Sequence, residues 1–537
     1  MMPRSSARRP NSVTCWTHHP ARATVVTMRR WLLPVMLVAC TDPQDGGGDA
    51  SAGTTGSTSD STPTESGAPT NTSATTDGPN TTDTTGAPDT TGAPDTTGAP
   101  DTTDTSSGGP PPPACPLGDV ILKTQDDVLA VAGCTDFPGD VTVLRDVTDL
   151  APLAGVHHIA GTLKLGGFEY GAQSMLTSLA ALSDLESVGG LDLTQIDIPD
   201  LLVFSKLTEV PGPVSIVGFD ILTLEGLHNL TSIGGRLRIS GCADLVDLDG
   251  LHGLQHLGGG MQLDNLSIAD LHGLENLAEF GVPGGDPVPL RLAILPELVS
   301  LDALGFPWHD AIDVSLYDTA LPNLGIFAGV PELYGLDLDT NKLLTGLAGL
   351  ESLVKLRGTL DVHANPGIVD ISPLANLQSV GGLVITGAPF DDLSPLGSLT
   401  TVGALTVSHT NFTDLSPLPA LQTLGHVELY LNKSLTDLSL LKGVTTLDSL
   451  TMQMNDALVD LPELAELGDI KGDLYIGDNA ALPTLADLAA LKSVGGRLEI
   501  VVNPALPQAD AVAWAAPILV GKDRKIAGNK DPDPLAD

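Results

Sequence analysis

An apolar–polar–apolar triplet recurs along most of the chain. Most intervals between triplets are 22–24 residues, and the two longest, 28 and 29 residues, contain the insertions "GFEYGAQS" and "GVPGGDP". A fixed period of this length is typical of a solenoid, in which each turn contacts its neighbours. The first apolar residues of the triplets are Val141, Leu163, Leu191, Val214, Leu237, Met261, Leu290, Ile312, Leu336, Leu360, Leu383, Leu405, Val427, Leu450, Leu474 and Leu498.

Each triplet predicts a short β-strand whose two apolar residues face the core and whose middle residue faces solvent. Between triplets, segments such as "LTDLSLLKGVTTL" and "IVDISPLANLQSV" space Leu and Ile two to four residues apart. Such segments can line a core without forming a long helix. We therefore expect about sixteen turns with one parallel strand each, in an array roughly 75 Å long at about 4.8 Å per strand.

Glycine pairs precede several triplets, as in "SVGGLDLTQ", "SIGGRLRIS", "SVGGLVITG" and "SVGGRLEIV". A glycine pair inside a strand would weaken it. We therefore expect Gly381 and Gly382 to lie before the strand, where glycine adopts backbone angles that other residues resist.

Asparagine occupies one phase of the period, three residues after the second apolar residue of the triplet. A buried amide at this position can bond the backbone of adjacent turns where the chain leaves the sheet. Cys242 lies at the same phase, and we interpret it as a small buried residue and not as a reactive thiol. The asparagines of this predicted ladder are Asn341, Asn365, Asn432, Asn455, Asn479 and Asn503.

The repeat resembles two related families. "DLSPLPALQTLGHVELYLN" (414–432) is similar to a 22-residue leucine-rich repeat, and the "LxSVGGxLxIxxN" pattern of 491–503 resembles the receptor L-domain. The resemblance implies a right-handed, leucine-rich-repeat-like β-solenoid. The segment 115–143 resembles the opening cap of the L-domain, which implies a disulfide between Cys115 and Cys134. The segment 503–529 resembles the closing cap, but Gln508 stands where a cysteine is expected and no cysteine follows it.

The N-terminus resembles a bacterial lipoprotein signal. "MRRWLLPVMLVAC" (28–40) has a basic start, a nine-residue apolar run and a final Cys40. The run is too short to span a bilayer. The resemblance implies cleavage before Cys40 and lipidation of its thiol, with Met28 as the expected start. The alternative is an ordinary secretory signal with a chance cysteine.

A Thr-, Ser-, Gly-, Pro-, Ala- and Asp-rich segment follows Cys40 and repeats "TTGAPD". It cannot bury enough apolar surface to offset its ordering entropy, so we expect an extended, disordered tether. The predicted organisation is an extension and signal over 1–39, a linker over 40–114, an N-terminal cap over 115–140, the solenoid over 141–505, and a C-terminal cap and tail over 506–537.

The amino-acid composition limits the classes of partner that the protein is expected to bind. The net charge of −41 argues against nucleic acid, whose phosphates need Lys and Arg, and against attraction to an anionic membrane surface. It is compatible with a basic partner, a cation or simple solubility. We therefore expect membrane attachment through the lipid anchor only, with the protein in the cell envelope at the outer membrane or cell surface.

Catalytic motifs are absent from the sequence. It contains no Walker loop, GxGxxG, GxSxG or HExxH motif, so we expect no enzyme activity, no cofactor and no metal. His228, His252 and His272 share the contexts "LHNL" and "LHGL", which favour a variable solvated position over metal binding. "DLVDLDG" (244–250) has a calcium-like carboxylate spacing, but it also follows the repeat phrase.

The candidate ligand-binding surface is the solvent side of the strands. Three successive middle residues are acidic, although like charges on neighbouring strands repel. Exposed aromatic residues beside charges suit an interface. The predicted contact residues are Asp313, Asp337, Asp339, Asp361, His363, Glu428, Tyr430 and Tyr475.

These patterns favour a surface lipoprotein that binds a protein or glycan through its strand face, in an adhesive or receptor-like role. One alternative is a passive component of the envelope or coat. A second alternative is a β-helix enzyme that degrades polysaccharides, which would need a basic residue near the carboxylates. Arg291 is the nearest such residue along the column.

Overall fold

The computed structural model describes residues 115–167, 173–218, 220–415, 418, 421 and 423–530. The chain divides into two units, Met1–Thr103 and Asp104–Asp537, and all described residues belong to the second. The predicted signal, Cys40, the predicted linker over 40–114 and the tail after Lys530 lie outside the described residues.

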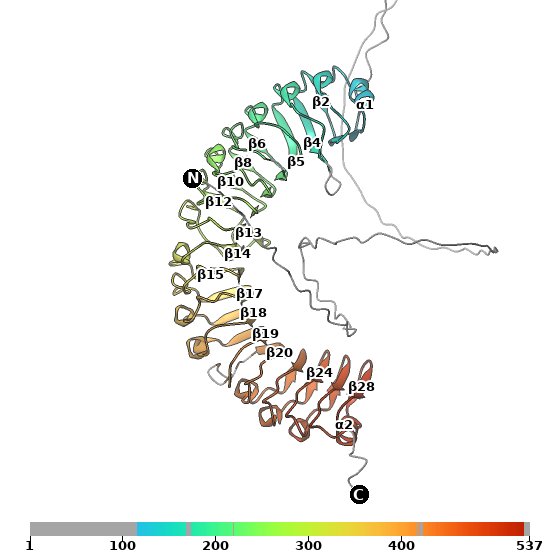
Figure 1. Ribbon diagram of the computed structural model, residues 1–537, viewed down its shortest axis with the longest axis vertical. Coiled ribbons are helices and arrows are strands. Elements are labelled where there is room, and N and C mark those ends of the chain that lie inside the picture. Colours follow the sequence, from blue (N-terminus) through green and yellow to red (C-terminus); the bar gives the residue numbers. More distant parts are fainter. Residues whose placement is uncertain are drawn as a thin grey trace, which may run out of the picture. The chain divides into compact units, whose positions relative to one another are not determined.

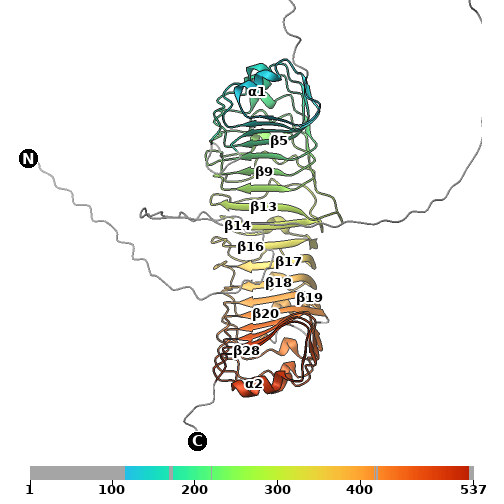
Figure 2. The ribbon, with the colours of Figure 1, turned by 90° about the vertical axis from the view of Figure 1, so that its right-hand side faces the viewer.

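A 20-stranded sheet runs the length of the folded unit, and each strand pairs in parallel with strands of adjacent turns. The turns stack in chain order, and this sheet lines the concave side of the folded unit (Figures 1 and 2). Its strands are β1 (Val120–Leu122), β2 (Asp136–Phe137), β3 (Val141–Leu144), β4 (His158–Gly166), β5 (Ser187–Thr194), β7 (Val214–Val217), β9 (Leu237–Ser240), β11 (Met261–Asp264), β13 (Val288–Leu295), β14 (Ile312–Thr319), β15 (Glu332–Leu333), β16 (Gly335–Asp339), β17 (Lys355–His363), β18 (Ser379–Thr386), β19 (Thr401–Ser408), β20 (Thr423–Tyr430), β22 (Ser449–Gln453), β24 (Leu474–Gly477), β26 (Leu498–Val501) and β28 (Arg524–Ala527).

Two smaller parallel sheets are formed by two-residue strands that precede the main strand of their turns. The sequence pattern did not predict them, because two residues are too few to show an alternation. One contains β6 (Glu209–Val210), β8 (Ser232–Ile233), β10 (His256–Leu257) and β12 (Glu279–Phe280), and the other contains β21 (Thr446–Leu447), β23 (Asp469–Ile470), β25 (Ser493–Val494) and β27 (Leu519–Val520).

Ten of the outer segments in the described part of the chain contain a single 3₁₀ turn, in agreement with the expectation of no long helix. Asp370 is typical of their start, because its carboxylate accepts a hydrogen bond from the Ser372 backbone N–H at 2.8 Å. These turns are Ala151–Leu153, Ala180–Leu182, Leu202–Phe204, Asp249–Leu251, Gly325–Phe327, Ser372–Leu374, Ser394–Ser398, Ser439–Leu441, Pro462–Leu464 and Ala486–Leu488.

The core is aliphatic and continuous through the stacked turns. In β17, Leu360 and Val362 are 0% and 4% exposed, while Asp361 between them is half-buried and faces solvent. Burial of each such aliphatic side chain stabilises the fold by about 1.5–3 kcal/mol. The alternation within the triplet therefore places the polar middle residues on one face of the large sheet.

The N-terminal cap contains β1, helix α1 (Gln125–Ala130) and β2. Thr124 and Asp127 form a capping box at the start of α1. Cys115 and Cys134 form the disulfide that the family resemblance implies, with their Cα atoms 5.6 Å apart.

The C-terminal cap contains helix α2 (Gln508–Ala515), β27 and β28. Gln508 stands where the resemblance expects a cysteine, and its amide joins α2 to β28 instead. Its Nε2 donates to the Ile526 carbonyl at 2.9 Å, and its Oε1 accepts from Asn529 Nδ2 at 3.1 Å. The family pattern has a disulfide at this end of the solenoid, and in this chain hydrogen bonds of Gln508 connect the same elements.

The expectation that Gly381 and Gly382 precede their strand was wrong. Both lie inside β18, and neither is among the residues with positive φ. A Cβ at Gly381 would lie 2.3 Å from the Arg357 carbonyl oxygen in the turn before it. Glycine is needed there because two backbones approach each other closely, and not because the backbone angles are unusual.

The strand register corrects one triplet. Leu290 pairs with Val314, and Val314 pairs with Leu336, so the triplet of β14 begins at Val314 and not at Ile312. "IDVSLYDT" contains two overlapping triplets, and both give intervals within the period. Hydrogen bonding between the turns decides which of the two is in register with the neighbouring triplets.

No helix within the described residues combines the length and the apolar character needed to cross a bilayer.

Candidate ligand-binding strand face

The strand face is the solvent side of the large sheet. On it, Asp337 of β16 and Asp361 of β17 lie directly opposite each other, and Asp339 lies opposite His363. We call Asp337, Asp339 and Asp361 the acidic patch. The structure therefore brings together four of the predicted contact residues on two neighbouring strands.

Asp313 is not part of the predicted three-residue column. In the corrected register Ser315 lies between Arg291 and Asp337, while Asp313 pairs with Pro289 and Gly335. Asp313 is thus two residues earlier along β14, on the same side of the sheet. Burial against the neighbouring strand raises the pKa of its carboxyl.

The electrostatics of Asp337 reflect crowding on the sheet. The adjacent strands displace water around its carboxyl although its side chain reaches the surface, and this desolvation raises its pKa. The charge of Asp339 raises the pKa further, and Arg291 acts in the opposite direction. The Ser315 hydroxyl lies 3.5 Å from the Asp337 carboxylate. The patch therefore holds negative charge at a cost that an incoming cation would reduce.

Tyr317 is a residue of this face that the sequence reasoning missed. It pairs with Ala293 on one side and Asp339 on the other, so an aromatic residue borders the acidic patch. The misplaced triplet concealed it. Thr319, which occupies the asparagine phase when the triplet starts at Val314, was the available signal.

The remaining predicted contact residues form a separate group. Glu428 of β20 pairs with Thr451 of β22, and Thr451 pairs with Tyr475 of β24. Tyr430 follows Glu428 by two residues along β20. Burial raises the pKa of the Tyr475 hydroxyl, and the charges of Asp478 and Glu499 raise it further. Two strands, β18 and β19, separate this group from the acidic patch.

The predicted asparagines form a buried ladder along the corner where the chain leaves the sheet. Asn479 illustrates the pattern: its Nδ2 donates to the Met452 carbonyl at 3.0 Å, and its Oδ1 accepts from the Asn455 backbone N–H at 3.0 Å. An equivalent bond joins Asn341 to Asn365. A second series of such bonds runs from Asn432 to Asn455, Asn479, Asn503 and finally Asn529.

Three further residues belong to the ladder and were not predicted. Asn529 continues it into the C-terminal cap, while Thr319 and Thr410 begin its two blocks by donating their hydroxyls to Asn341 and Asn432, each at 2.7 Å. Residues just before ladder positions have positive φ, as Met454 does at 57°. This backbone conformation is uncommon for residues other than glycine, and it also occurs before the apolar residues Ile196, Leu266 and Leu295 at the same phase, so it belongs to the turn itself and not to the ladder bonds.

Cys242 is buried at the same phase. Its Sγ lies 3.9 Å from the Ile216 carbonyl, which is the acceptor equivalent to the one an asparagine Nδ2 uses. Its place in the fold agrees with a structural interpretation.

The three histidines do not share one position. Gly226, Gly250 and Gly273 each approach the carbonyl of the preceding turn, which makes them equivalent. His228 and His252 lie two residues after their glycines, whereas His272 lies one residue before Gly273. The motif "LHGL" therefore occurs at two different positions within the repeat, so His252 and His272 are not equivalent residues.

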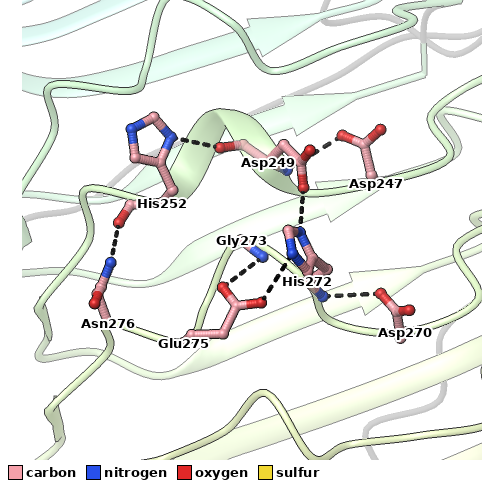
Figure 3. Close-up of polar contacts among 8 residues, drawn as sticks. All are labelled: Asp247, Asp249, His252, Asp270, His272, Gly273, Glu275 and Asn276. Carbon is pink, nitrogen blue, oxygen red and sulfur yellow. Dashed lines mark hydrogen bonds and ion pairs between the residues drawn. The ribbon is translucent and has the colours of Figure 1, made fainter.

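Figure 3 shows the resulting contacts. His272 Nδ1 lies 2.6 Å from Asp249 Oδ1, and its Nε2 lies 3.5 Å from Glu275 Oε1. Hydrogen bonding to Asp249, together with the charge of Glu275, raises the pKa of His272. These are exposed ion pairs, which contribute little to stability. Within the described residues, no group of three or more His, Cys, Asp or Glu side chains is arranged to hold a metal ion.

No family model matches the chain. The chain is 26% identical to a cell surface GPI-anchored protein of Arthroderma benhamiae over 312 residues, which are 49% of this chain and 76% of that protein.

Solved structures that superpose on the chain include an internalin (InlF) from Listeria monocytogenes, with a TM-score of 0.34, 20% identity and coverage of 62% of this chain and 85% of that one. The functional domain of InlJ from Listeria monocytogenes has a TM-score of 0.34 and 16% identity, covering 61% and 67%. TLR13 in its complex with ssRNA13 has a TM-score of 0.28 and 14% identity, covering 76% and 82%. By its own strand pairing, buried leucines and asparagine ladder, the chain is a leucine-rich-repeat β-solenoid.

Proposed function

We propose that this protein is displayed at a cell surface and binds a protein or glycan ligand through the strand face. Three observations support a surface location. The relative from Arthroderma benhamiae is described as a cell surface protein, the sequence before Cys40 resembles a lipoprotein signal, and the Cys115–Cys134 disulfide fits an oxidising compartment. A lipid anchor on Cys40 and an outer-membrane location are the finer part of this proposal.

The observation that carries the proposal is the pairing of Asp337 with Asp361 on adjacent parallel strands. Like charges placed directly opposite each other destabilise a sheet. The same positions on β18 and β19 hold Val384 and Thr406, so the fold does not require a carboxylate there. Two adjacent carboxylates on an open face are therefore better explained by a ligand than by folding.

For the strand face, a binding role is a simpler proposal than an enzymatic role. Two depressions of the described surface, with volumes of about 80 and 230 Å³, lie among the outer segments. Their lining residues include Val299, Asp302 and Ile326 in one, and Thr345, Asp370 and Pro373 in the other. An open sheet suits the contact surface of a large ligand more than the enclosure of a small substrate.

The test replaces Asp337 and Asp361 with Lys in the full chain and measures saturable capture of ligand from an extracellular extract. The matched control replaces Asp244 and Asp456, which are exposed on loops beyond the ladder, with Lys. We expect the first variant to lose capture by at least about tenfold and the control to retain it. Retained capture by the first variant would contradict the site, and no saturable capture by the wild type would favour a passive coat. Protease treatment of intact cells tests surface display, which predicts release of the folded unit.

A further inference from the structure

Two arginines lie on the strand face beside the acidic patch. Arg238 of β9 pairs with Gln262 of β11, and Gln262 pairs with Arg291 of β13. Arg238 and Arg291 therefore flank one glutamine in a single row, and we call them the arginine pair. Arginine is scarce in this protein, where Lys and Arg together number 25 against 66 Asp and Glu. Two arginines so close on one face are unexpected from the composition.

The row between the two arginines is packed and already hydrogen-bonded. Gln262 and Asp264 are each 8% exposed, and Gln262 Nε2 donates to Asp264 Oδ2 at 2.5 Å. Arg291 Nε lies 3.5 Å from Asp264 Oδ1, which is longer than a normal hydrogen bond. Asp264 Oδ1 is buried without a hydrogen-bond partner, so Asp264 meets Arg291 as an ion pair and not through a normal hydrogen bond.

Both arginines have unused hydrogen-bonding capacity. The Nε atoms of Arg238 and Arg291 are buried and have no hydrogen-bond acceptor, and no ion pair joins Arg238 to another described residue. Because these Nε atoms are buried, an incoming ligand would meet the outer guanidinium nitrogens instead, and the Arg291 side chain is 35% exposed. Carboxylates are the natural acceptors, because the guanidinium fork matches their geometry. This end of the face is therefore built to receive negative charge.

The acidic patch begins two strands farther along the sheet, after β14. Neighbouring strands are about 4.8 Å apart, so Arg291 and Asp337 are separated by roughly 10 Å across the sheet. The charge of Arg291 is felt at Asp337, where it opposes the effects that raise the pKa of that carboxyl. The charge on the strand face thus changes from positive to negative over a distance that about three residues of an extended segment can cover.

We propose that the arginine pair and the acidic patch form one dipolar site for a protein segment that carries acidic and basic side chains a few residues apart. Its carboxylates would contact Arg238 and Arg291, and its lysines or arginines would contact Asp337 and Asp361. The inference rests on the proposed function and narrows its ligand class. A polyanionic glycan satisfies only the arginine pair and is repelled by the patch, whereas a protein presents both signs at this spacing.

The test uses three synthetic peptides of equal length and fluorescence anisotropy with the full chain at low and moderate salt. One peptide carries three glutamates followed by three lysines, one carries only the lysines and one only the glutamates. We expect the dipolar peptide to bind at least about tenfold more tightly than either of the others, with an affinity that falls as salt is added.

Three double substitutions of arginine locate the contact. Arg238→Ser with Arg291→Ser should reduce the affinity for the dipolar peptide to that of the lysine peptide or below it, while the affinity for the lysine peptide stays equal or rises because Arg291 no longer opposes the patch. Arg145→Ser with Arg497→Ser removes the same charge elsewhere and should change neither affinity. Arg238→Lys with Arg291→Lys should give an intermediate loss, and it serves as the test if the serine variant does not fold.

The proposal is overturned if the dipolar peptide binds no more tightly than the lysine peptide, or if the arginine variants bind it as the wild type does. These outcomes can be separated from failure of the proposed function. Should the Asp337 and Asp361 substitutions abolish capture from an extracellular extract while the arginine substitutions leave it intact, the strand face binds a ligand but the site is not dipolar.

Discussion

Asn479 makes buried contacts with two neighbouring turns, and a surface amide such as Asn276 does not. Replacing Asn479 with Ala would leave the Met452 carbonyl and the Asn455 N–H buried without partners. We expect this change to cost about 3 kcal/mol and to speed hydrogen exchange in β22 and β24. The measurement is chemical denaturation combined with residue-resolved hydrogen exchange.

Asn276 provides the matched control, because its Nδ2 donates to the His252 carbonyl at 2.8 Å in the same manner but at an exposed site (Figure 3). Asn276→Ala should change stability by no more than about 0.5 kcal/mol, as surface substitutions usually do. Equal effects at the two positions would contradict a structural role for the ladder.

The ladder was predictable from sequence because its spacing repeats, whereas Asp313 was assigned to the wrong row. "IDVSLYDT" satisfies the alternation in two ways, and only pairing with β13 and β16 distinguishes them. The arginine pair was invisible for a different reason. Arg238 and Arg291 are 53 positions apart in the numbering, and a period gives their phase but not the burial of their Nε atoms.

Asp313 gives a pH-dependent prediction. Burial raises its folded-state pKa above the ordinary value of 3.8, so the folded chain holds this proton more tightly than the unfolded chain. The stability linked to that proton is present below about pH 3.8 and is lost as pH rises through the folded-state pKa. Asp313→Asn should therefore raise the unfolding midpoint at neutral pH, and the difference should vanish in acid.

Asp140 provides a control of opposite sign. Lys164 donates to its carboxylate at 2.6 Å and lowers its pKa, so its contribution to stability is present above pH 3.8 and is lost as pH falls through the folded-state pKa. Asp140→Asn should lower the midpoint at neutral pH and have little effect in acid. Identical pH profiles for the two variants would contradict the assigned environments.

At the level of elements, the close approach of adjacent turns explains the glycine pair of β18. A Cβ at Gly381 would meet two backbone oxygens, those of Arg357 and Gly358, at 2.3 and 2.8 Å. Gly381→Ala should destabilise β17 and β18 by about 2 kcal/mol, because backbone atoms must move to admit the methyl group. Thermal unfolding and hydrogen exchange of these two strands measure the effect.

Gly397 tests the specificity of that result. It lies in the 3₁₀ turn Ser394–Ser398, a Cβ added to it would meet no atom within 4 Å, and its φ is not positive. Gly397→Ala should be neutral or slightly stabilising, since it restricts the unfolded chain without a clash. Destabilisation of similar size at both glycines would show that loss of flexibility, and not crowding, is responsible.

For the whole molecule, the repeat period and apolar alternation were sufficient to predict a parallel solenoid, and the family resemblance implied the Cys115–Cys134 disulfide. Neither could predict how charge is distributed over the strand face, because that depends on which residues the register places side by side. The register separates Asp313 from the acidic patch, adds Tyr317 beside it, and sets the arginine pair two strands away.

The central claim is that the ligand contacts the strand face. Carboxyl labelling of the full chain, read residue by residue with and without an extracellular extract that saturates capture, tests this claim most directly. We predict that ligand protects Asp337, Asp339 and Asp361 from labelling and leaves Asp244 and Asp456 as reactive as before. Protection of the loop carboxylates with no change in the acidic patch would contradict the claim.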